Sequence, residues 1–216
     1  MNFWGMIVEL LSGLVVSVEI FVFTLAIALP LGFVIALGRM HGNPMVSGCF
    51  RGYISIVRGT PLMLQILFVY FAPYFIFGLP LSGYPRLLAT ILAFSLNYAA
   101  YFAEIYRGGI LSIDRGQTEA AVALGMSRAT TFFRIILPQT VKRVIPAVGN
   151  EVITLVKDTS LAFTIAVTEM FTLAKQLSSA NTTMVPLIAA GVFYYLFNFI
   201  VAWLMERVEK RLGYYS

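Results

Sequence analysis

Three long stretches of this chain contain no Asp, Glu, Lys or Arg, and they constrain the fold more than any other feature. They cover residues 20–38, 59–85 and 176–205. A helix of about 20 apolar residues crosses the hydrocarbon core of a bilayer. Soluble domains carry about 25% charged residues, whereas this chain carries 12%. We therefore expect an all-α membrane protein.

The hydrophobic pattern predicts five transmembrane helices in a single transmembrane domain that covers residues 1–216. The predicted spans lie at about 14–37, 53–72, 86–109, 144–167 and 185–205. The fourth span is the most polar of the five, because it contains Glu151, Lys157 and Asp158. A polar segment at about 110–143 joins the third span to the fourth.

The basic residues are distributed unequally between the two sides of this five-span arrangement. Arg86 and Lys175 fall on one side, and Lys157 lies within the fourth span. The other twelve basic residues fall on the opposite side: Arg39, Arg51, Arg58, Arg107, Arg115, Arg128, Arg134, Lys142, Arg143, Arg207, Lys210 and Arg211. Positively charged loops face the cytoplasm. We therefore expect an N-terminus outside the cell and a cytoplasmic C-terminus, with segment 110–143 also in the cytoplasm. An arrangement with six spans would instead place either the C-terminal tail or segment 110–143 outside the cell.

The composition also excludes several classes of site. Cys49 is the only cysteine and His41 the only histidine, so the chain has no internal disulfide and no cluster of cysteines or histidines for a metal. It lacks the G-x-x-x-x-G-K-[ST] phosphate-binding motif. We expect no metal and no cofactor in this chain, and the one-sided placement of the basic residues argues against nucleic acid. The first basic residue is Arg39, so no cleaved signal peptide is expected.

The segment from Glu119 to Pro138, EAAVALGMSRATTFFRIILP, predicts two short helices separated by a turn. Good helix formers follow Glu119, and Gly125 is typical of a helix end. A second helix is expected over Thr130–Leu137, with Pro138 ending it. The segment is therefore a surface element that a partner protein could bind.

This segment resembles the coupling-loop signature of ABC importer permeases, with the full spacing. The matching residues are Glu119, Ala120, Ala121, Gly125, Ile135, Leu137 and Pro138. Two further segments strengthen the resemblance and narrow it to the polar amino-acid uptake branch of the family. They are Arg58-Gly59-Thr60-Pro61 followed by Gln65, and Gly149–Glu151 followed by Lys157–Leu161. The resemblance extends over nearly the whole chain.

The resemblance implies a transport subunit, and not an enzyme, in a bacterial inner (cytoplasmic) membrane. It implies three kinds of protein partner: a separate ABC ATPase that holds ATP and Mg²⁺, a second permease subunit that is either a copy of this chain or a different one, and an extracytoplasmic substrate-binding protein. Residues 119–125 would fill a groove on the ATPase and drive alternating access. The alternative is that residues 119–138 form an ordinary amphipathic loop at the membrane interface.

The third predicted span carries three polar residues on one face. Asn97, Tyr101 and Glu104 are spaced i, i+4 and i+7. Intramembrane charges usually face a cavity or a partner, so this face is a candidate lining for a transport path. Two alternatives remain: Glu104 pairs with Arg107 or Arg58, and the two other side chains form hydrogen bonds between helices.

The fourth predicted span has a similar face. Glu151, Thr154 and Asp158 are spaced i, i+3 and i+7. Glu151 has no basic residue within four positions. The alternative for Asp158 is a structural pair with Lys157 at a helix break. The two faces together predict a polar pocket between the helices.

Such a pocket suits a zwitterionic amino acid, whose ammonium group needs carboxylates and whose carboxylate needs amide or backbone donors. Gln65 lies one turn after Pro61, so it is a further candidate. Glu104 and Glu151, without an unpaired basic residue at mid-membrane, favour cationic substrates such as arginine, lysine or histidine. Glutamine or cystine is the second choice. A secondary transporter would need more spans or an inverted repeat, and an intramembrane enzyme would need a nucleophile–base pair or a metal cluster.

Overall fold

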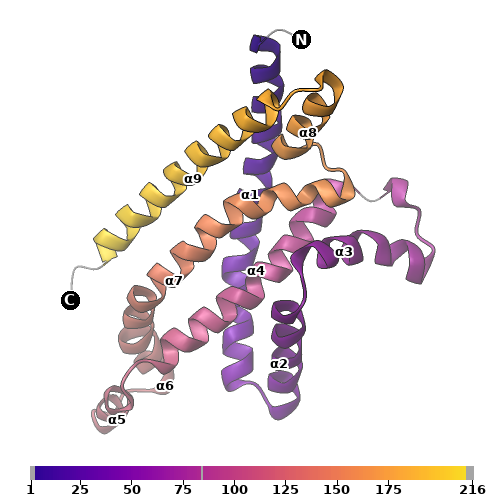
Figure 1. Cartoon of the computed structure of the whole chain (residues 1–216). Helices are drawn as coiled ribbons and strands as arrows, with labels where there is room; N and C mark the ends of the chain where they lie inside the picture. The colour runs from indigo at the N-terminus through magenta and orange to yellow at the C-terminus, as the bar shows by residue number, and fades with distance from the viewer. Residues whose placement is uncertain (1–2, 84, 213–216) are drawn as a thin grey trace.

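The computed structural model describes residues 3–83 and 85–212, and these residues form helices and connections without a strand. The predicted all-α class is confirmed. The α-helices are α1 (Phe3–His41), α2 (Pro44–Gly59), α3 (Leu62–Phe77), α4 (Arg86–Leu111), α5 (Arg115–Ala123), α6 (Arg128–Thr131), α7 (Leu137–Asp158), α8 (Met170–Asn181) and α9 (Val185–Leu212) (Figure 1). Shorter elements are 3₁₀ turns at Leu81–Gly83 and Thr159–Ile165 and a π-helical turn at Phe132–Ile136.

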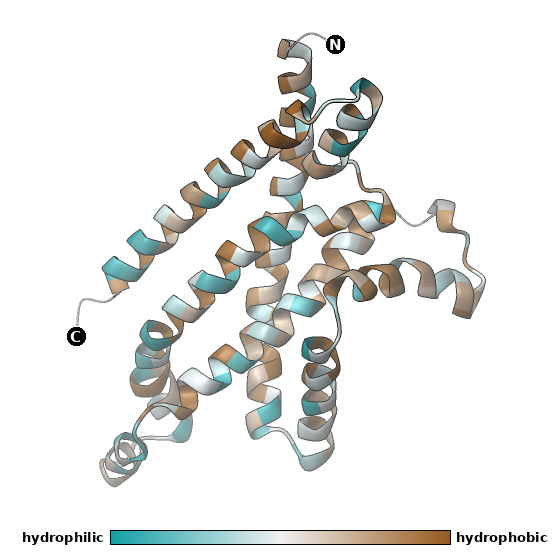
Figure 2. Ribbon diagram, viewed as in Figure 1, coloured by the Kyte–Doolittle hydropathy of each residue, from teal (hydrophilic) through white to brown (hydrophobic). Residues whose placement is uncertain are grey.

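Several helices are long and apolar enough to cross a membrane, so the chain is a multi-pass membrane protein. By length and composition α1, α4 and α9 each qualify, and α2 with α3 qualifies as a bent pair. Figure 2 shows hydrophobic residues along α1, α3 and α9 and hydrophilic residues at the C-terminal end of α9. Among the described residues this criterion therefore finds three spans, or four with the bent pair, and α7 does not meet it.

The single straight helix predicted over residues 53–72 is wrong. Helices α2 and α3 are separate and bent by 114° at the break between them. Thr60 is extended, with φ −123° and ψ 147°, and Pro61 follows it. Proline has no N–H for the helical ladder and pushes the preceding residue out of the helical region. The break therefore follows from local chemistry that a hydropathy pattern does not register.

The prediction for residues 130–167 also needs correction. Pro138 does not end a helix: it lies in the first turn of α7, where a missing N–H costs little. Helix α7 therefore begins before the predicted span 144–167, and it ends at Asp158, where the Thr159–Ile165 turn takes over. Ala166, with φ 55°, closes that turn.

The main core is centred on α4, which packs most extensively against α1. Gly32 of α1 makes this close approach possible, because a Cβ there would lie 2.8 Å from the Cβ of Phe102. Buried side chains such as Ile66 and Leu155 extend the core to α3 and α7. The two predicted polar faces, on α4 and α7, are therefore held on packed neighbouring helices.

A second, smaller core joins the N-terminal part of α1 to α8 and the start of α9. It is built from buried residues that include Met6, Leu10, Met170 and Leu173. Figure 1 shows the N-terminal end of α1, α8 and the start of α9 at the top of the molecule, whereas α5 and α6 lie at the opposite end. The molecule therefore has two distinct ends, with the bundle of α1, α4 and α7 between them.

Candidate functional site

The turn after α5 explains why glycine is needed at position 125. Gly125 has φ +75°, its N–H donates to the Val122 carbonyl at 2.9 Å, and the Met126 N–H donates to the Ala121 carbonyl at 3.0 Å. These two bonds are the Schellman pattern that closes a helix with a left-handed residue. The predicted helix and glycine turn are confirmed. Ser127 then caps α6 by accepting from the Thr130 N–H.

The turn presents an accessible tip. Glu119 and Ala120 are exposed, and Leu124 is 81% exposed. Ala121, by contrast, is 1% exposed and anchors α5 inward. A Cβ added to Gly125 would meet no atom within 4 Å. The tip is therefore exposed and open to a partner.

Side-chain contacts tie this tip to the helical bundle. The amides of Gln117 on α5 and Gln139 on α7 donate to each other, at 3.0 and 2.5 Å. Arg143 of α7 donates to the Ser112 carbonyl just after α4. A displacement of α5 can therefore reach α7 directly, and α7 carries Glu151, Thr154 and Asp158.

Glu104 lies at the centre of an arginine cluster. Its carboxylate pairs with Arg39 of α1 and with Arg107 at 2.9 Å, and Arg58 of α2 lies at 4.0 Å. The alternative of pairing with Arg107 or Arg58 is thus what the structure shows. Arg39 was not expected as a partner, because it lies on a helix distant in sequence. If Glu104 contacts a substrate, it does so while it is paired with these arginines.

Gln65 and Asn97 meet across α3 and α4. The Asn97 side-chain N–H donates to the Gln65 side-chain oxygen at 3.0 Å, and the Gln65 amide in turn donates to the Val57 carbonyl at 2.8 Å. Asn97 and Gln65 therefore act as links between helices, in line with the alternative for Asn97.

The Arg58 guanidinium lies 5.2 Å from the centre of the Tyr101 ring, within cation–π range.

The predicted face on α7 is divided between different partners. The Tyr98 hydroxyl donates to Asp158 at 2.7 Å, and the Thr154 hydroxyl donates to the carbonyl of Asn150. The alternative pairing of Lys157 with Asp158 is not among the ion pairs of the described residues, and Lys157 is exposed. Glu151 is half-buried, and Arg58 and Asp158 are the charged groups that act on it electrostatically.

Glu169 is a feature that the sequence reasoning missed. Its side chain is fully buried and accepts from the backbone N–H groups of Phe171 and Thr172 at the start of α8. Tyr194 of α9 also donates to it, at 3.0 Å. The available signal was a lone carboxylate in an apolar stretch that lacks a basic neighbour. Within residues 3–83 and 85–212, no group of three His, Cys, Asp or Glu side chains could hold a metal ion.

Comparisons with known proteins agree on one family. The family described as "Binding-protein-dependent transport system inner membrane component" matches residues 28–214. An octopine transport system permease protein, OccM, of Rhizobium radiobacter is 40% identical over 97% of this chain and 88% of its own length. An L-cystine transport system permease protein, TcyL, of Bacillus subtilis is 37% identical over 98% of this chain and 91% of its own length.

A solved structure shows the same arrangement of helices. It is described as the crystal structure of an amino acid ABC transporter with histidines, and it is 30% identical with a TM-score of 0.87. The alignment covers 98% of this chain and 99% of that chain. The similarity therefore includes residues 119–138, both polar faces and the second core.

Proposed function

The chain belongs to the family of inner membrane components of binding-protein-dependent transport systems, as a transport subunit of the amino-acid ABC permease type, and on that premise we propose that it imports polar amino acids, with a preference for cationic ones. Its membrane would be the bacterial inner membrane. ATP hydrolysis would occur in a separate ABC ATPase that binds ATP and Mg²⁺.

The observation that carries the substrate proposal is the state of the carboxylates on α7. Glu104 has arginine partners, but Glu151 and Asp158 have no ion pair among the described residues. Both are half-buried, and a charge in this position usually faces a cavity or a partner. We infer that these two carboxylates receive the cationic groups of the substrate. Tyr98 donates to Asp158, and Asn97 and Tyr101 lie on the same helix, so these three residues would supply neutral hydrogen-bonding groups.

Arg58 is a candidate for the opposite end of the substrate. Its side chain is 44% exposed, and it reaches the Tyr101 ring while remaining 4.0 Å from Glu104. A guanidinium has five N–H donors, so a loose contact with one carboxylate leaves donors for another. The substrate α-carboxylate would bind here, with Gln65 holding the break beside it and Thr154 on the facing helix.

We further propose five membrane segments: α1, the bent pair α2–α3, α4, α7 with its following turn, and α9. The N-terminus would lie outside and the C-terminus in the cytoplasm. The positions of twelve basic residues support this orientation. The separation of the N-terminal end of α1 from α5 and α6, at opposite ends of the molecule, is consistent with it (Figure 1).

In this arrangement the coupling turn would face the ATPase. The residues from Glu119 to Gly125 would enter a groove on that partner, and closure of the ATPase on ATP would push α5. The Gln117–Gln139 contact would pass the displacement to α7. A second permease subunit, either identical or different, and an extracytoplasmic binding protein would complete the importer.

The test is equilibrium binding of labelled arginine to the purified complex of permease and ATPase. Competition by lysine and histidine, with loss of binding in Glu151→Gln, is the expected result. The matched control is Glu209→Gln, which removes an exposed carboxylate of α9. Loss of arginine binding in the control to the same extent would refute the assignment of Glu151.

Two other outcomes would favour competing proposals. Competition by glutamine or cystine, unchanged in Glu151→Gln, would favour the neutral substrates; the cystine transport permease among the relatives makes that a concrete second candidate. Uptake driven by an ion gradient without a co-purifying ATPase would favour a secondary transporter.

A further inference from the structure

A groove of about 760 Å³ lies between the membrane helices and the coupling helices. One side is formed by the C-terminal ends of α1 and α4, which contribute Leu37 and Ile110. The other side is formed by α5, α6 and the π-helical turn, which contribute Phe132 and Ile136. Its apolar walls thus begin on spanning helices and continue beyond them.

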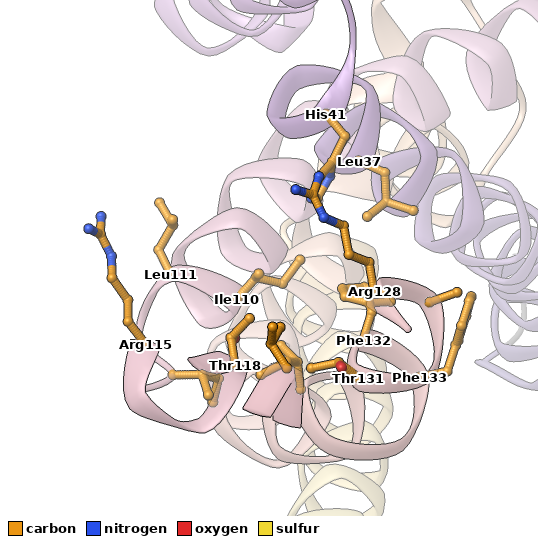
Figure 3. A pocket seen from close by; sticks show the side chains of 14 residues that line it. Leu37, His41, Ile110, Leu111, Arg115, Thr118, Arg128, Thr131, Phe132 and Phe133 are labelled. Atoms are coloured by element: carbon orange, nitrogen blue, oxygen red, sulfur yellow. The ribbon is translucent and has the colours of Figure 1, made fainter. Parts of the chain in front are cut away.

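Basic side chains stand at the edges of this groove. Figure 3 shows Arg128 extending toward His41 and Leu37, and Arg115 beside Leu111 at the other edge. No hydrogen bond or ion pair within the described part of the chain engages the side chains of Arg115, Arg128 or His41. The lining includes no carboxylate. The groove therefore combines an apolar floor with uncompensated positive charge.

Of residues 119–125, which we assign to the ATPase, only Val122 lines the groove. Leu124, which is exposed at the tip of the coupling turn, is not part of the lining, and neither are Glu119 and Gly125. Asp114, which is adjacent in sequence to the lining residues Ile113 and Arg115, is occupied in capping α5 through the Gly116 N–H. An occupant of the groove would thus leave the coupling tip free.

We propose that this groove binds an anionic phospholipid of the inner leaflet. Its acyl chain would lie against Leu37, Ile110 and Phe132, and its phosphate would meet Arg128 and His41. Basic pockets between membrane helices at the cytoplasmic side bind anionic headgroups, because the two charges attract at the boundary of the bilayer. The lipid would connect the ends of α1 and α4 to the coupling helices.

The experiment is native mass spectrometry of the full-length chain with its ATPase in detergent, titrated with phosphatidylglycerol or phosphatidylcholine. Arg128→Gln tests the basic edge. Arg134→Gln is its matched control, because Arg134 is exposed in the same segment but does not line the groove. Thr118→Trp, at an exposed lining position outside residues 119–125, fills the groove without a change of charge.

The wild-type complex and Arg134→Gln should bind phosphatidylglycerol about fivefold more tightly than Arg128→Gln, the effect expected for one basic group near an anionic headgroup. Thr118→Trp should weaken this binding as well. Equal affinity of the wild-type complex for the two lipids, or an equal loss in Arg134→Gln, would overturn the proposal. So would binding that disappears when the ATPase is added. The readout does not involve amino-acid uptake, so it is independent of the proposed substrate.

Discussion

The hydroxyl of Tyr194 on α9 donates a hydrogen bond of 3.0 Å to the fully buried carboxylate of Glu169. Ser17 of α1 lies at 3.5 Å from the same carboxylate, and Thr172 donates to it from both its backbone N–H and its hydroxyl. A buried charge is tolerated when donors satisfy it. Glu169 therefore joins α1, α8 and α9 through hydrogen bonds at the end of the molecule opposite to the coupling helices.

Tyr194→Phe should destabilise the protein by roughly 1–3 kcal/mol, because it removes one hydrogen bond to a charged group and leaves the ring in place. The measurement is the thermal unfolding of the purified protein in detergent. Tyr195→Phe is the matched control, since the neighbouring tyrosine is exposed. An equal melting temperature for wild type and Tyr194→Phe would show that Glu169 does not depend on α9.

Gly125→Asp should leave the protein folded in the membrane and abolish most ATP-driven uptake. Aspartate tolerates a positive φ better than most residues, and no atom of the chain lies near the new side chain. The added charge would instead meet the partner that receives the turn. The measurement is amino-acid uptake by whole cells, normalised to the amount of the protein in the membrane.

Gly52→Ala is the control for this substitution, because Gly52 lies within α2 and a Cβ there also meets nothing within 4 Å. It should keep full uptake. Normal uptake in Gly125→Asp would refute the role of the turn in coupling.

Pro61→Ala should weaken the break between α2 and α3. Alanine supplies the missing N–H and allows Thr60 to become helical. Spin labels at Cys49, which is exposed on α2, and at an introduced Phe75→Cys on α3 would report the change by pulsed EPR. We expect a broader distribution with longer distances. Pro73→Ala, within α3, should leave the main distance unchanged.

An unchanged distribution in Pro61→Ala would mean that packing against α4, and not the proline, sets the 114° bend.

Glu104→Gln should lower the free energy of unfolding by about 3 kcal/mol. Removal of one partner of a buried ion pair costs roughly 3–5 kcal/mol, and the lower end applies here. Glu104 is only 16% exposed, and its removal leaves Arg39, Arg58 and Arg107 without the shared carboxylate. Chemical unfolding measures the loss. Glu206→Gln breaks an exposed pair with Lys210, so it should cost about 0–1 kcal/mol. Equal effects of the two substitutions would show that the arginine cluster is not a stabilising centre.

Features that depend on a few neighbouring residues were predictable from the sequence. The third span was expected at 86–109 and α4 covers Arg86–Leu111, because Pro85 precedes the helix and the residues between Arg86 and Glu104 carry no charge. The glycine turn after α5 was predicted for the same reason, since a helix end needs one left-handed residue. The break at Pro61 is equally local, but an average of hydropathy over the segment conceals it.

Contacts between distant segments could not be read from spacing. The pairing of Arg39 with Glu104 joins α1 to α4, and no periodicity relates the two positions. Thr154 shares a face with Glu151 by spacing, yet its hydroxyl bonds to its own helix. The cap formed by Glu169 depends on donors from three helices. The sequence identifies the polar faces of α4 and α7, and the structure identifies the hydrogen-bond and ion-pair partners of their side chains. Contacts of these side chains with a substrate therefore stay predictions.

The π-helical turn at Phe132–Ile136 sets the rotational phase of α7 relative to α6. Each residue of an α-helix turns the chain by about 100°, and a π turn holds extra backbone compared with an α turn. Deleting one residue here would convert the π turn to an α turn and leave the Glu151 face of α7 almost in place, whereas inserting one residue would swing that face by about 100°, although every side chain of the face would be intact. The segment should therefore tolerate many substitutions and very few insertions, because its length fixes the direction of the face that we propose for the substrate relative to α5 and α6.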